Sequence, residues 1–270
     1  MSATLVITSL TNDRVKAIRA LEMRKVRKET GLFVAEGVSI LVTARDNGFR
    51  PETLIMQTGT AASGIQRGLL TWAHNERAEV LEVSEAVLAK LASKDNPQTM
   101  LGVFRQKFVP APAPPAVSEN ATWIVLEEVR DPGNLGTIIR TAEAAGAAGV
   151  ILVGNCCDPF APETIRATMG SVFAVPLVKM ERENFADFAK SWPGDVVATH
   201  LSARDDFRSV SFRAPELIVM GSEGPGLSDA ALAVCTRRVK IPMSGQLDSL
   251  NLAIATALTL YQVRGQRLKV

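Results

Sequence analysis

The chain has 270 residues, of which 47% are hydrophobic and 21% charged, and its formal net charge is +2. This balance is typical of globular proteins and excludes a wholly disordered chain, and the length suffices for about two domains. Three cysteines, two of them adjacent, provide neither a disulfide framework nor a spaced set of metal ligands. The sequence shows no secretion signal at its start and no apolar stretch of about 18 residues. We therefore expect a cytoplasmic protein without a membrane span.

The first part of the chain alternates between helical and strand patterns. Residues 12–30 predict a helix with seven basic and three acidic side chains, which indicates either a surface for a polyanion or a solvated helix face. Apolar periodicity then predicts a small α/β domain. Its helices are expected at 38–48, 64–76 and 85–94, and its strands at 32–37, 53–57, 78–84 and 100–106.

A proline-rich segment separates this part from the rest. Four prolines fall within residues 108–120, a composition typical of an extended and semi-rigid linker. The charge also changes sign here, because residues 1–107 hold 15 basic and 11 acidic side chains and the remainder holds 15 and 17. We therefore expect one domain over 1–107 and another over 121–270.

The second domain shows apolar runs without alternation, which are typical of parallel strands covered on both faces. An open parallel sheet is therefore expected, with ligands at the carboxyl ends of its strands, although the pattern does not predict strand order. Strands are expected at 123–129, 149–154, 175–180, 195–200, 216–221 and 238–243. Helices are expected at 134–146, 162–171, 184–191, 227–235 and 249–265.

Polar residues gather where three of these strands end. In DPGNLGTIIRTAE (131–143), Asp131 and Asn134 lie at a strand-to-helix turn that offers backbone N–H groups to an anion, and Arg140 follows along the helix. A helix cap with a surface arginine is the alternative. In VMGSEGPGLSD (219–229), Glu223 stands among three glycines whose spacing fits neither the dinucleotide nor the Walker motif. A tight turn is the alternative for this segment.

The third polar segment precedes the long apolar helix near the end of the chain. Ser249 is a possible N-cap, whereas Asn251 in the first turn needs hydrogen-bond partners because Asn is a poor helix former. The helix is too apolar for a free surface, so one face is expected to pack on the domain core or on a second subunit.

Several kinds of chemistry lack support. The two histidines, His74 and His200, have no companions at ligand spacing, so no metal site is expected. No nucleophile motif of the acyl-transfer enzymes is present, and the cysteines are expected to be inert. Aromatic residues make up 5% of the chain, which argues against a stacking platform for single-stranded RNA.

Taken together, the three segments resemble the motifs of the SpoU/TrmH family of the SPOUT class, which are S-adenosylmethionine-dependent RNA ribose 2′-O-methyltransferases. DPGNLGTIIRTAE resembles the first motif, IVMGSEGPGLS the second and IPMSGQLDSLNLAIATALTLY the third. Each motif alone is a weak indication of the family, but the three motifs in this order are specific to it. The domain before the linker resembles the ribosomal-protein-like substrate-binding domain of many members.

The resemblance implies an α/β catalytic domain with a deep trefoil knot, a homodimer that completes the active site, and no metal. It implies catalytic roles for Asn134, Arg140, Glu223, Ser249 and Asn251. It implies cofactor contacts at Gly221, Ile241 and Leu250, with Thr199 and Met243 as neighbours. For the first domain it implies RNA binding, which we assign to Arg14, Lys16, Arg24, Lys25, Arg27 and Lys28.

The reaction implied is the in-line attack of a ribose hydroxyl on a sulfonium methyl group, which requires positioning and stabilisation of the developing alkoxide. A guanidinium is almost always protonated, so Arg140 suits charge stabilisation and phosphate binding better than proton abstraction. Glu223 or a phosphate-linked water are candidate proton acceptors. We expect large ribosomal RNA as the substrate. The alternatives are tRNA, a non-catalytic RNA-binding protein, and an NAD-dependent enzyme, which the glycine spacing disfavours.

Overall fold

The computed structural model describes residues 5–59, 62–92, 99–246 and 248–266. The chain forms two compact units, of which the first comprises 1–107 with 158–174 and the second comprises 108–157 with 175–270. The segment 158–174, expected in the second domain, thus belongs to the first unit. Its aromatic side chains explain this placement, because the rings of Phe160 and Phe173 pack on Phe33, with centroids 4.8 and 5.8 Å away.

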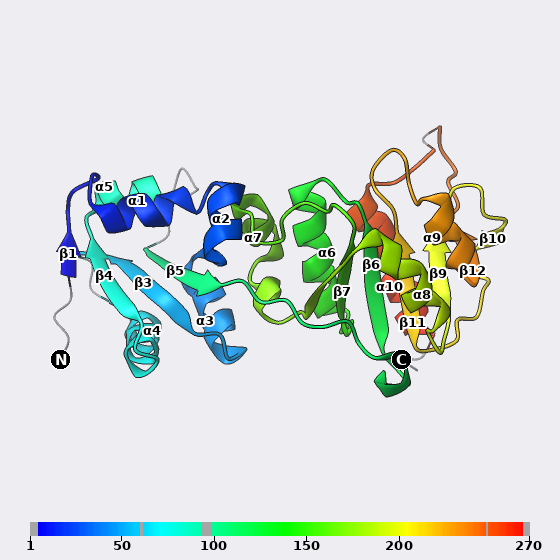
Figure 1. Cartoon of the computed structure of the whole chain (residues 1–270), viewed down its shortest axis with the longest axis horizontal. Coiled ribbons are helices and arrows are strands. Elements are labelled where there is room, and N and C mark those ends of the chain that lie inside the picture. The colour runs from blue at the N-terminus through cyan, green and yellow to red at the C-terminus, as the bar shows by residue number, and fades with distance from the viewer. Residues whose placement is uncertain (1–4, 60–61, 93–98, 247, 267–270) are drawn as a thin grey trace. The chain divides into compact units, whose positions relative to one another are not determined.

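The first unit is built on a mixed five-stranded sheet in the order β1-β4-β3-β5-β2 (Figure 1). The β1, β4 and β3 strands are parallel, whereas β5 runs antiparallel to both β3 and β2. The short β1 was not predicted, because three residues are too few to show a periodicity. The strands are β1 (Leu5–Ile7), β2 (Leu32–Glu36), β3 (Pro51–Gln57), β4 (Glu79–Val83) and β5 (Met100–Arg105).

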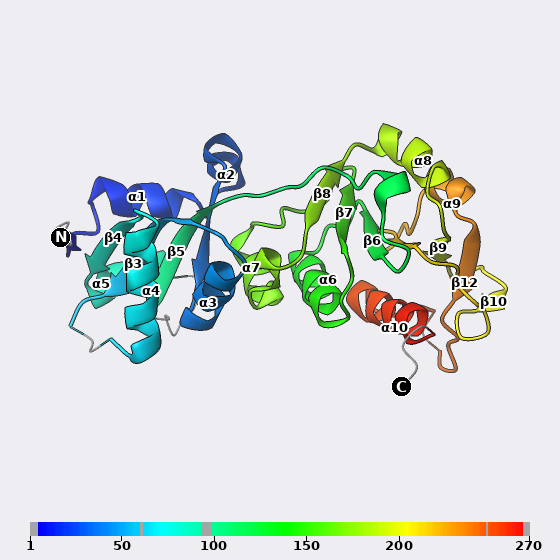
Figure 2. The same cartoon turned by 90° about the horizontal axis from the view of Figure 1, so that it is seen from below.

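Helices cover this sheet and bury its core. The α1 and α5 helices bury apolar side chains with β1, β3, β4 and β5, while α3 and α4 pack together (Figure 2). The α7 helix packs on β2. The helices are α1 (Asp13–Ala20), α2 (Arg24–Thr30), α3 (Val38–Asp46), α4 (Gly64–Asn75), α5 (Glu85–Leu91) and α7 (Pro162–Thr168), followed by the 3-10 turn η2 (Ser171–Phe173).

The basic helix predicted over 12–30 is two helices, because the chain breaks between α1 and α2. Arg27 stabilises this break, since one of its terminal nitrogens donates to the carbonyls of Leu21 and Glu22 at 2.8 and 2.7 Å. Its other nitrogens bind the carboxylate of Asp158, at 2.8 Å for both Nε and Nη2. The Arg27 side chain is only 4% exposed. Its assignment to the RNA-binding set was therefore wrong, because every polar contact that it makes is inside the fold.

The second unit contains a seven-stranded sheet in the order β10-β12-β9-β11-β6-β7-β8. All neighbouring pairs are parallel, as the unbroken apolar runs predicted. The two-residue β10 was not predicted. The strands are β6 (Thr122–Glu127), β7 (Gly149–Val153), β8 (Leu177–Met180), β9 (Val196–Thr199), β10 (Asp205–Asp206), β11 (Glu216–Met220) and β12 (Arg237–Lys240).

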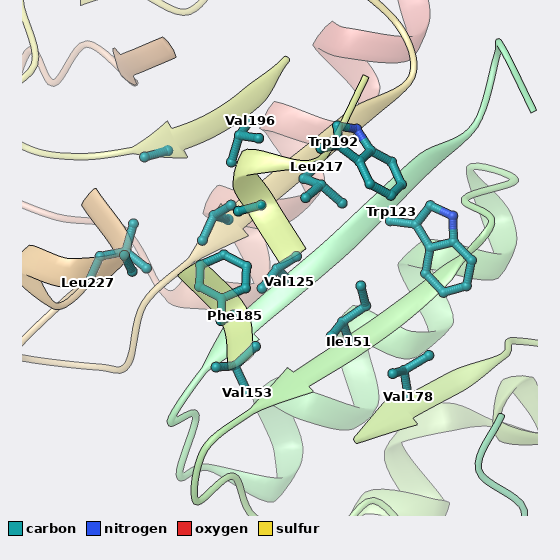
Figure 3. Close-up of a cluster of buried hydrophobic side chains, with 14 residues drawn as sticks. Trp123, Val125, Ile151, Val153, Val178, Phe185, Trp192, Val196, Leu217 and Leu227 are labelled. Carbon is teal, nitrogen blue, oxygen red and sulfur yellow. The ribbon is translucent and has the colours of Figure 1, made fainter. Parts of the chain in front are cut away.

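Helices cover both faces of this sheet, as the unbroken apolar runs also predicted. The α8 (Arg182–Lys190) and α9 (Asp229–Val234) helices lie on one face, and α6 (Pro132–Ala144) and α10 (Leu252–Gly265) lie on the other (Figure 2). Figure 3 shows the core under α8 and α9, where Trp192 lies beside Trp123 and Phe185 lies near Val125 and Val153. The central strands β6, β7 and β11 are therefore buried along their whole length.

The proline-rich segment is attached to the second unit. The Val109 N–H donates to the Leu177 carbonyl at 2.9 Å, and Val109 and Val117 pack against the core of this unit. A 3-10 turn, η1 (Pro114–Ala116), lies within the segment. The composition predicted an extended spacer, but its valines provide enough apolar surface to bind it to the sheet.

Candidate active site

The three polar segments lie at one edge of the second unit's sheet. Because β6, β11 and β12 are parallel, the loops that follow their carboxyl ends emerge on the same side. The first loop leads into α6, the second carries the glycines, and the third leads into α10. This arrangement brings together residues that are about 90 to 120 positions apart in the sequence.

A chain of hydrogen bonds connects one residue from each loop. The side-chain amide of Asn251 donates to Oδ1 of Asn134 at 2.8 Å. The side-chain amide of Asn134 donates in turn to Oε1 of Glu223 at 2.7 Å. Oε2 of the same carboxylate accepts from the backbone N–H of Arg130 at 3.5 Å. Three of the five predicted catalytic residues therefore form one polar network.

Helix capping determines the direction of this network. Oδ1 of Asn251 accepts from the backbone N–H groups of Ala253 and Ile254, so Asn251 is the N-cap of α10 and only its NH₂ group faces Asn134. The sequence had left Ser249 as a possible N-cap. With its carbonyl oxygen occupied, Asn134 presents its own NH₂ group to Glu223. An acceptor is required there, and a carboxylate meets that requirement.

The start of α6 is capped in the same manner. Oδ1 of Asp131 accepts from the backbone N–H of Asn134 at 2.6 Å. The helix-cap alternative for this segment is thus correct for Asp131, and it is compatible with the polar network because capping fixes the backbone of Asn134.

The glycine loop is closed upon itself and carries Glu223 near its tip. Ser222 and Gly226 form an antiparallel bridge, with the Gly226 N–H donating to the Ser222 carbonyl at 3.0 Å. A side chain at Gly221 would overlap the backbone of Gly226 and Leu227, which explains the glycine at that position. The tight-turn alternative is therefore also correct, and the turn holds the carboxylate of Glu223 within reach of Asn134.

A buried carboxylate that the sequence analysis did not single out anchors the far end of this loop. Glu127 at the end of β6 is 3% exposed and accepts from the backbone N–H and the hydroxyl of Ser228 at 2.8 and 2.7 Å. Arg182 approaches the same carboxylate at 3.5 Å. Ser228 is also the N-cap of α9. The signal in the sequence was an acid at the end of an otherwise apolar strand.

Arg140 and Ser249 lie outside the hydrogen-bonded network. Arg140 is exposed on α6, and Ser249 is exposed in the loop before α10. Within the described part of the chain, neither side chain has a hydrogen bond or an ion pair with the other three residues.

The predicted cofactor positions include exposed apolar side chains. Met243 and Leu250 are each 37% exposed on the loop that leads to α10, where Ile241 is half-buried. Thr199 at the end of β9 shares a hydrogen bond of 3.2 Å with Thr259 of α10. Apolar groups close to polar loop ends suit a ligand that carries an aromatic ring and a charged group.

The cysteines are unsuited to nucleophilic chemistry. Burial, followed by the nearby groups Cys156, Glu223 and Asp131, raises the pKa of Cys157 to about 12. Burial likewise raises the pKa of Cys235 to about 12 and raises the pKa of Cys156. Among the described residues no cluster could hold a metal ion, and no helix is long and apolar enough to cross a bilayer.

Most of the basic residues predicted to bind RNA lie on the surface of the first unit. Arg14 forms an ion pair of 2.6 Å with Glu79, and both side chains are largely exposed. Lys16 and Lys25 pair with acids of their own helices at 3.2 and 3.9 Å. Arg24 and Lys28 are exposed as well. Exposed pairs of this kind are weak, so these cations remain accessible to a polyanion.

Comparison with known proteins adds independent information. Residues 121–261 match the model of the SpoU rRNA Methylase family, and residues 12–102 match that of the MRM3-like substrate binding domain. The chain is 29% identical to the 23S rRNA (guanosine(2553)-2′-O)-methyltransferase RlmP of Bacillus subtilis, over 96% of this chain and 99% of that protein.

Solved structures agree with this match. The AdoMet-bound rRNA methyltransferase of Sinorhizobium meliloti is 41% identical, with a TM-score of 0.91 over 98% of this chain and 99% of that one. The SpoU methyltransferase AviRb of Streptomyces viridochromogenes, in complex with AdoMet, is 30% identical, with a TM-score of 0.84 over 96% of this chain and 99% of that one. The family model covers more than half of the chain, the expected α/β fold is present, and the family's three motifs meet at one edge of the sheet. The chain therefore belongs to the SpoU rRNA methylase family, whose SPOUT-type catalytic domain follows a substrate-binding domain.

Proposed function

We propose that this protein transfers the methyl group of S-adenosylmethionine to a ribose 2′-hydroxyl of large ribosomal RNA. The observation that carries the proposal is the Asn251, Asn134 and Glu223 network, in which each of the three family motifs supplies one member. The relatives named as 23S rRNA 2′-O-methyltransferases support the choice of substrate. We also propose a cytoplasmic location, which the bacterial relatives named for 23S rRNA modification support.

The loop residues fit S-adenosylmethionine. The exposed apolar side chains of Met243 and Leu250 and the half-buried Ile241 provide apolar surface for an adenine ring, and Gly221 and Thr199 lie at the ends of neighbouring strands. When bound, the cofactor supplies an electrophilic methyl group on a sulfonium. We assign the binding of that cofactor to these five residues.

The network residues would position the ribose and receive its proton. Glu223 is held as an acceptor by Asn134 and by a backbone N–H, so one of its oxygen lone pairs can accept a hydrogen bond from the ribose hydroxyl. Glu223 and a phosphate-linked water are therefore the two candidate proton acceptors. Ser249 lies on the same loop as Asn251 and would contact the ribose or the cofactor.

Arg140 would stabilise the developing alkoxide and hold a phosphate of the RNA. Since it lies apart from the network within one chain, we propose that a homodimer brings it to the partner's site. A stripe on α10 supports a dimer, because Ile254, Leu258 and Tyr261 fall on one helix face and are 50%, 42% and 56% exposed. Leu258→Glu should convert a dimer into a monomer in light scattering. A wild-type monomer would contradict this part of the proposal.

The role of Arg140 can be tested separately. Arg140→Ala should abolish turnover, because an electrostatic contact made in the transition state is removed, and it should leave S-adenosylmethionine binding nearly intact. Calorimetry of cofactor binding and a methyl-transfer assay give the two readouts. Full activity of this variant would contradict the assignment.

The decisive experiment is methyl transfer from labelled S-adenosylmethionine to total RNA from cells that lack this gene, followed by size fractionation and alkaline hydrolysis. A 2′-O-methyl group blocks cleavage at its own linkage, so label in alkali-resistant dinucleotides of large rRNA supports the proposal. Label in tRNA would keep the reaction and change the substrate, an alternative that the name of one relative, a tRNA/rRNA methyltransferase, also suggests. No label in any fraction, with cofactor binding intact, would favour a non-catalytic RNA-binding protein.

A further inference from the structure

The first unit contains a hollow that lies outside the predicted RNA-binding helices. Its volume is about 550 Å³, and it lies where β3 begins, where β5 ends and where α4 ends. Its lining carries four basic and two acidic side chains. These are Arg50, Arg77, Arg105, Lys107, Glu52 and Glu76.

Ion pairs occupy two of these cations. Arg50 binds the carboxylate of Glu76 at 2.6 Å, and Arg105 binds that of Glu52 at the same distance. Arg50 also donates to the backbone carbonyl of Glu76 at 3.3 Å, so it caps the end of α4. The excess positive charge of the hollow therefore belongs to Arg77 and Lys107.

These two side chains have no acidic partner among the residues that the structure describes, and both are exposed. The ammonium of Lys107 lies 5.4 Å from the centroid of the Phe49 ring, which lines the same hollow. A cation over an aromatic face keeps its charge and its N–H donors available to an anion. An ammonium and a guanidinium therefore line the same hollow.

The backbone at Arg77 provides a second, independent observation. Arg77 has φ 59° and ends α4 in a Schellman motif, in which its N–H donates to His74 O and the Ala78 N–H donates to Ala73 O. Glycine is strongly preferred at this position because its backbone adopts positive φ without strain. The same two-bond ending occurs at α3 and α6, and there the chain uses Gly48 and Gly146.

Arginine at this position therefore costs conformational energy that glycine would avoid. Its side chain is exposed, and the described contacts give it no role in holding the fold together. A strained residue whose side chain does not stabilise its own unit is expected where that side chain binds something else.

We propose that this hollow binds a backbone phosphate of the RNA substrate, with Arg77 and Lys107 as the contacting cations. The inference rests on the proposed RNA substrate and assigns part of its binding to a new surface. A guanidinium matches the two oxygens of a phosphodiester, and the ammonium adds a point charge beside it. The neighbouring arginines are held in place by their acids, so they can support the phosphate without a change of conformation.

Two variants and one matched control test the proposal. In Arg77→Gly and Lys107→Gln one cation of the hollow is lost, whereas Lys90→Gln removes an exposed cation of α5 in the same unit, outside the lining. Affinity for purified large rRNA is measured by filter binding over a series of salt concentrations. Each hollow variant should weaken RNA binding by roughly 3- to 10-fold. It should also reduce the dependence of the binding constant on salt concentration by the equivalent of about one phosphate contact. The control should match wild type in both measurements.

Thermal unfolding separates binding from folding. Arg77→Gly should leave the melting temperature unchanged or raise it, because positive φ suits glycine. A lower melting temperature, or hollow variants with the same affinity and slope as Lys90→Gln, would overturn the proposal. Binding of a polyglutamate peptide that depends on Arg77, with RNA binding unaffected, would identify an acidic protein segment as the occupant instead.

The outcome is distinguishable from failure of the proposed function. Methyl transfer by the wild-type protein is measured in parallel with the same RNA. If the wild type transfers no methyl group, the proposed function fails, while the binding data still decide whether the hollow holds RNA. If transfer occurs and the hollow variants bind as the control does, only the present inference fails.

Discussion

The two units present polar chemistry in different ways. At the sheet edge of the second unit, Asn251, Asn134 and Glu223 are joined by hydrogen bonds whose direction is set by a helix cap. On the α1 and α2 surface of the first unit, basic side chains form exposed ion pairs one at a time, as Arg14 and Lys16 do. The sheet edge of the second unit resembles a site whose groups must be held in a fixed geometry. The α1 and α2 surface resembles a site where positive charge alone suffices to bind a polyanion.

Arg27 is the exception that sharpens this comparison. It belongs to the basic segment by sequence, yet it is buried and satisfied by two carbonyls and a carboxylate. Local charge counts therefore overestimate a binding surface whenever one member of the set has a structural role. The following variants compare side chains that are held by buried hydrogen bonds or ion pairs with side chains that form only exposed ion pairs.

The largest effect is expected at this buried ion pair. Arg27→Ala leaves Asp158 without its partner inside the fold and should lower the free energy of unfolding by about 3–5 kcal/mol. Lys25→Ala, which breaks an exposed pair of the same helix, should change it by at most about 0.5 kcal/mol. Urea unfolding of both variants provides the measurement. Similar losses for both would show that the two pairs do not differ as described.

The next largest effect concerns the network. Asn134→Ala removes the donor that holds Glu223 and should lower the rate constant for methyl transfer by roughly 100-fold, with cofactor affinity nearly unchanged. The control is Asn184→Ala on α8, an exposed asparagine of the same unit. Single-turnover assays with saturating cofactor and RNA report the chemical step. An unaltered rate would mean that the network does not serve the reaction.

A smaller effect is expected where Glu127 anchors the glycine loop. Ser228→Ala removes a hydroxyl that donates to the buried carboxylate, so Glu223 should be held less firmly and turnover should fall about tenfold. Ser228→Thr restores the hydroxyl and should recover the rate. A loss that threonine does not rescue would indicate that side-chain size, rather than this hydrogen bond, is what matters.

The smallest effect concerns the thiols. Since burial raises the pKa of Cys157 and Cys235 from 9.0 to about 12, the native protein should react slowly with iodoacetamide at pH 8.5. Stabilisation from these neutral thiols is complete below about pH 9 and is lost as the pH rises towards 12, because the folded state disfavours the thiolate. Mass spectrometry of native and denatured protein after labelling measures how fast these thiols react with iodoacetamide. Rapid labelling of the native protein would contradict the assigned burial.

The sequence predicted most of the regular structure. Apolar runs indicated a parallel sheet covered on both faces, and the structure confirms this from β6 to β12. The two strands that were missed, β1 and β10, have three and two residues and are too short to show a pattern. The glycine at 146 correctly indicated the end of α6. These features are local, so a stretch of sequence contains the information that defines them.

The candidate site was predicted only in part. The motifs indicated Asn134, Glu223 and Asn251, which the structure joins, but Glu127 was overlooked because a single acid at a strand end has no motif around it. The sequence analysis gave Ser249 as a possible N-cap of α10 and placed Asn251 in the first turn, whereas the structure makes Asn251 the cap. A choice of this kind depends on which side chain meets the first free N–H groups.

The sequence by itself determined most of the elements, the parallel class of the second unit's sheet and the set of residues available for chemistry, because hydrophobic period, turn residues and motifs are properties of neighbouring positions. Tertiary structure decided the strand order, the transfer of 158–174 to the first unit and the burial of Arg27. It also decided the direction of the Asn251, Asn134 and Glu223 bonds. Each of these depends on contacts between distant segments, whose energies no local pattern contains.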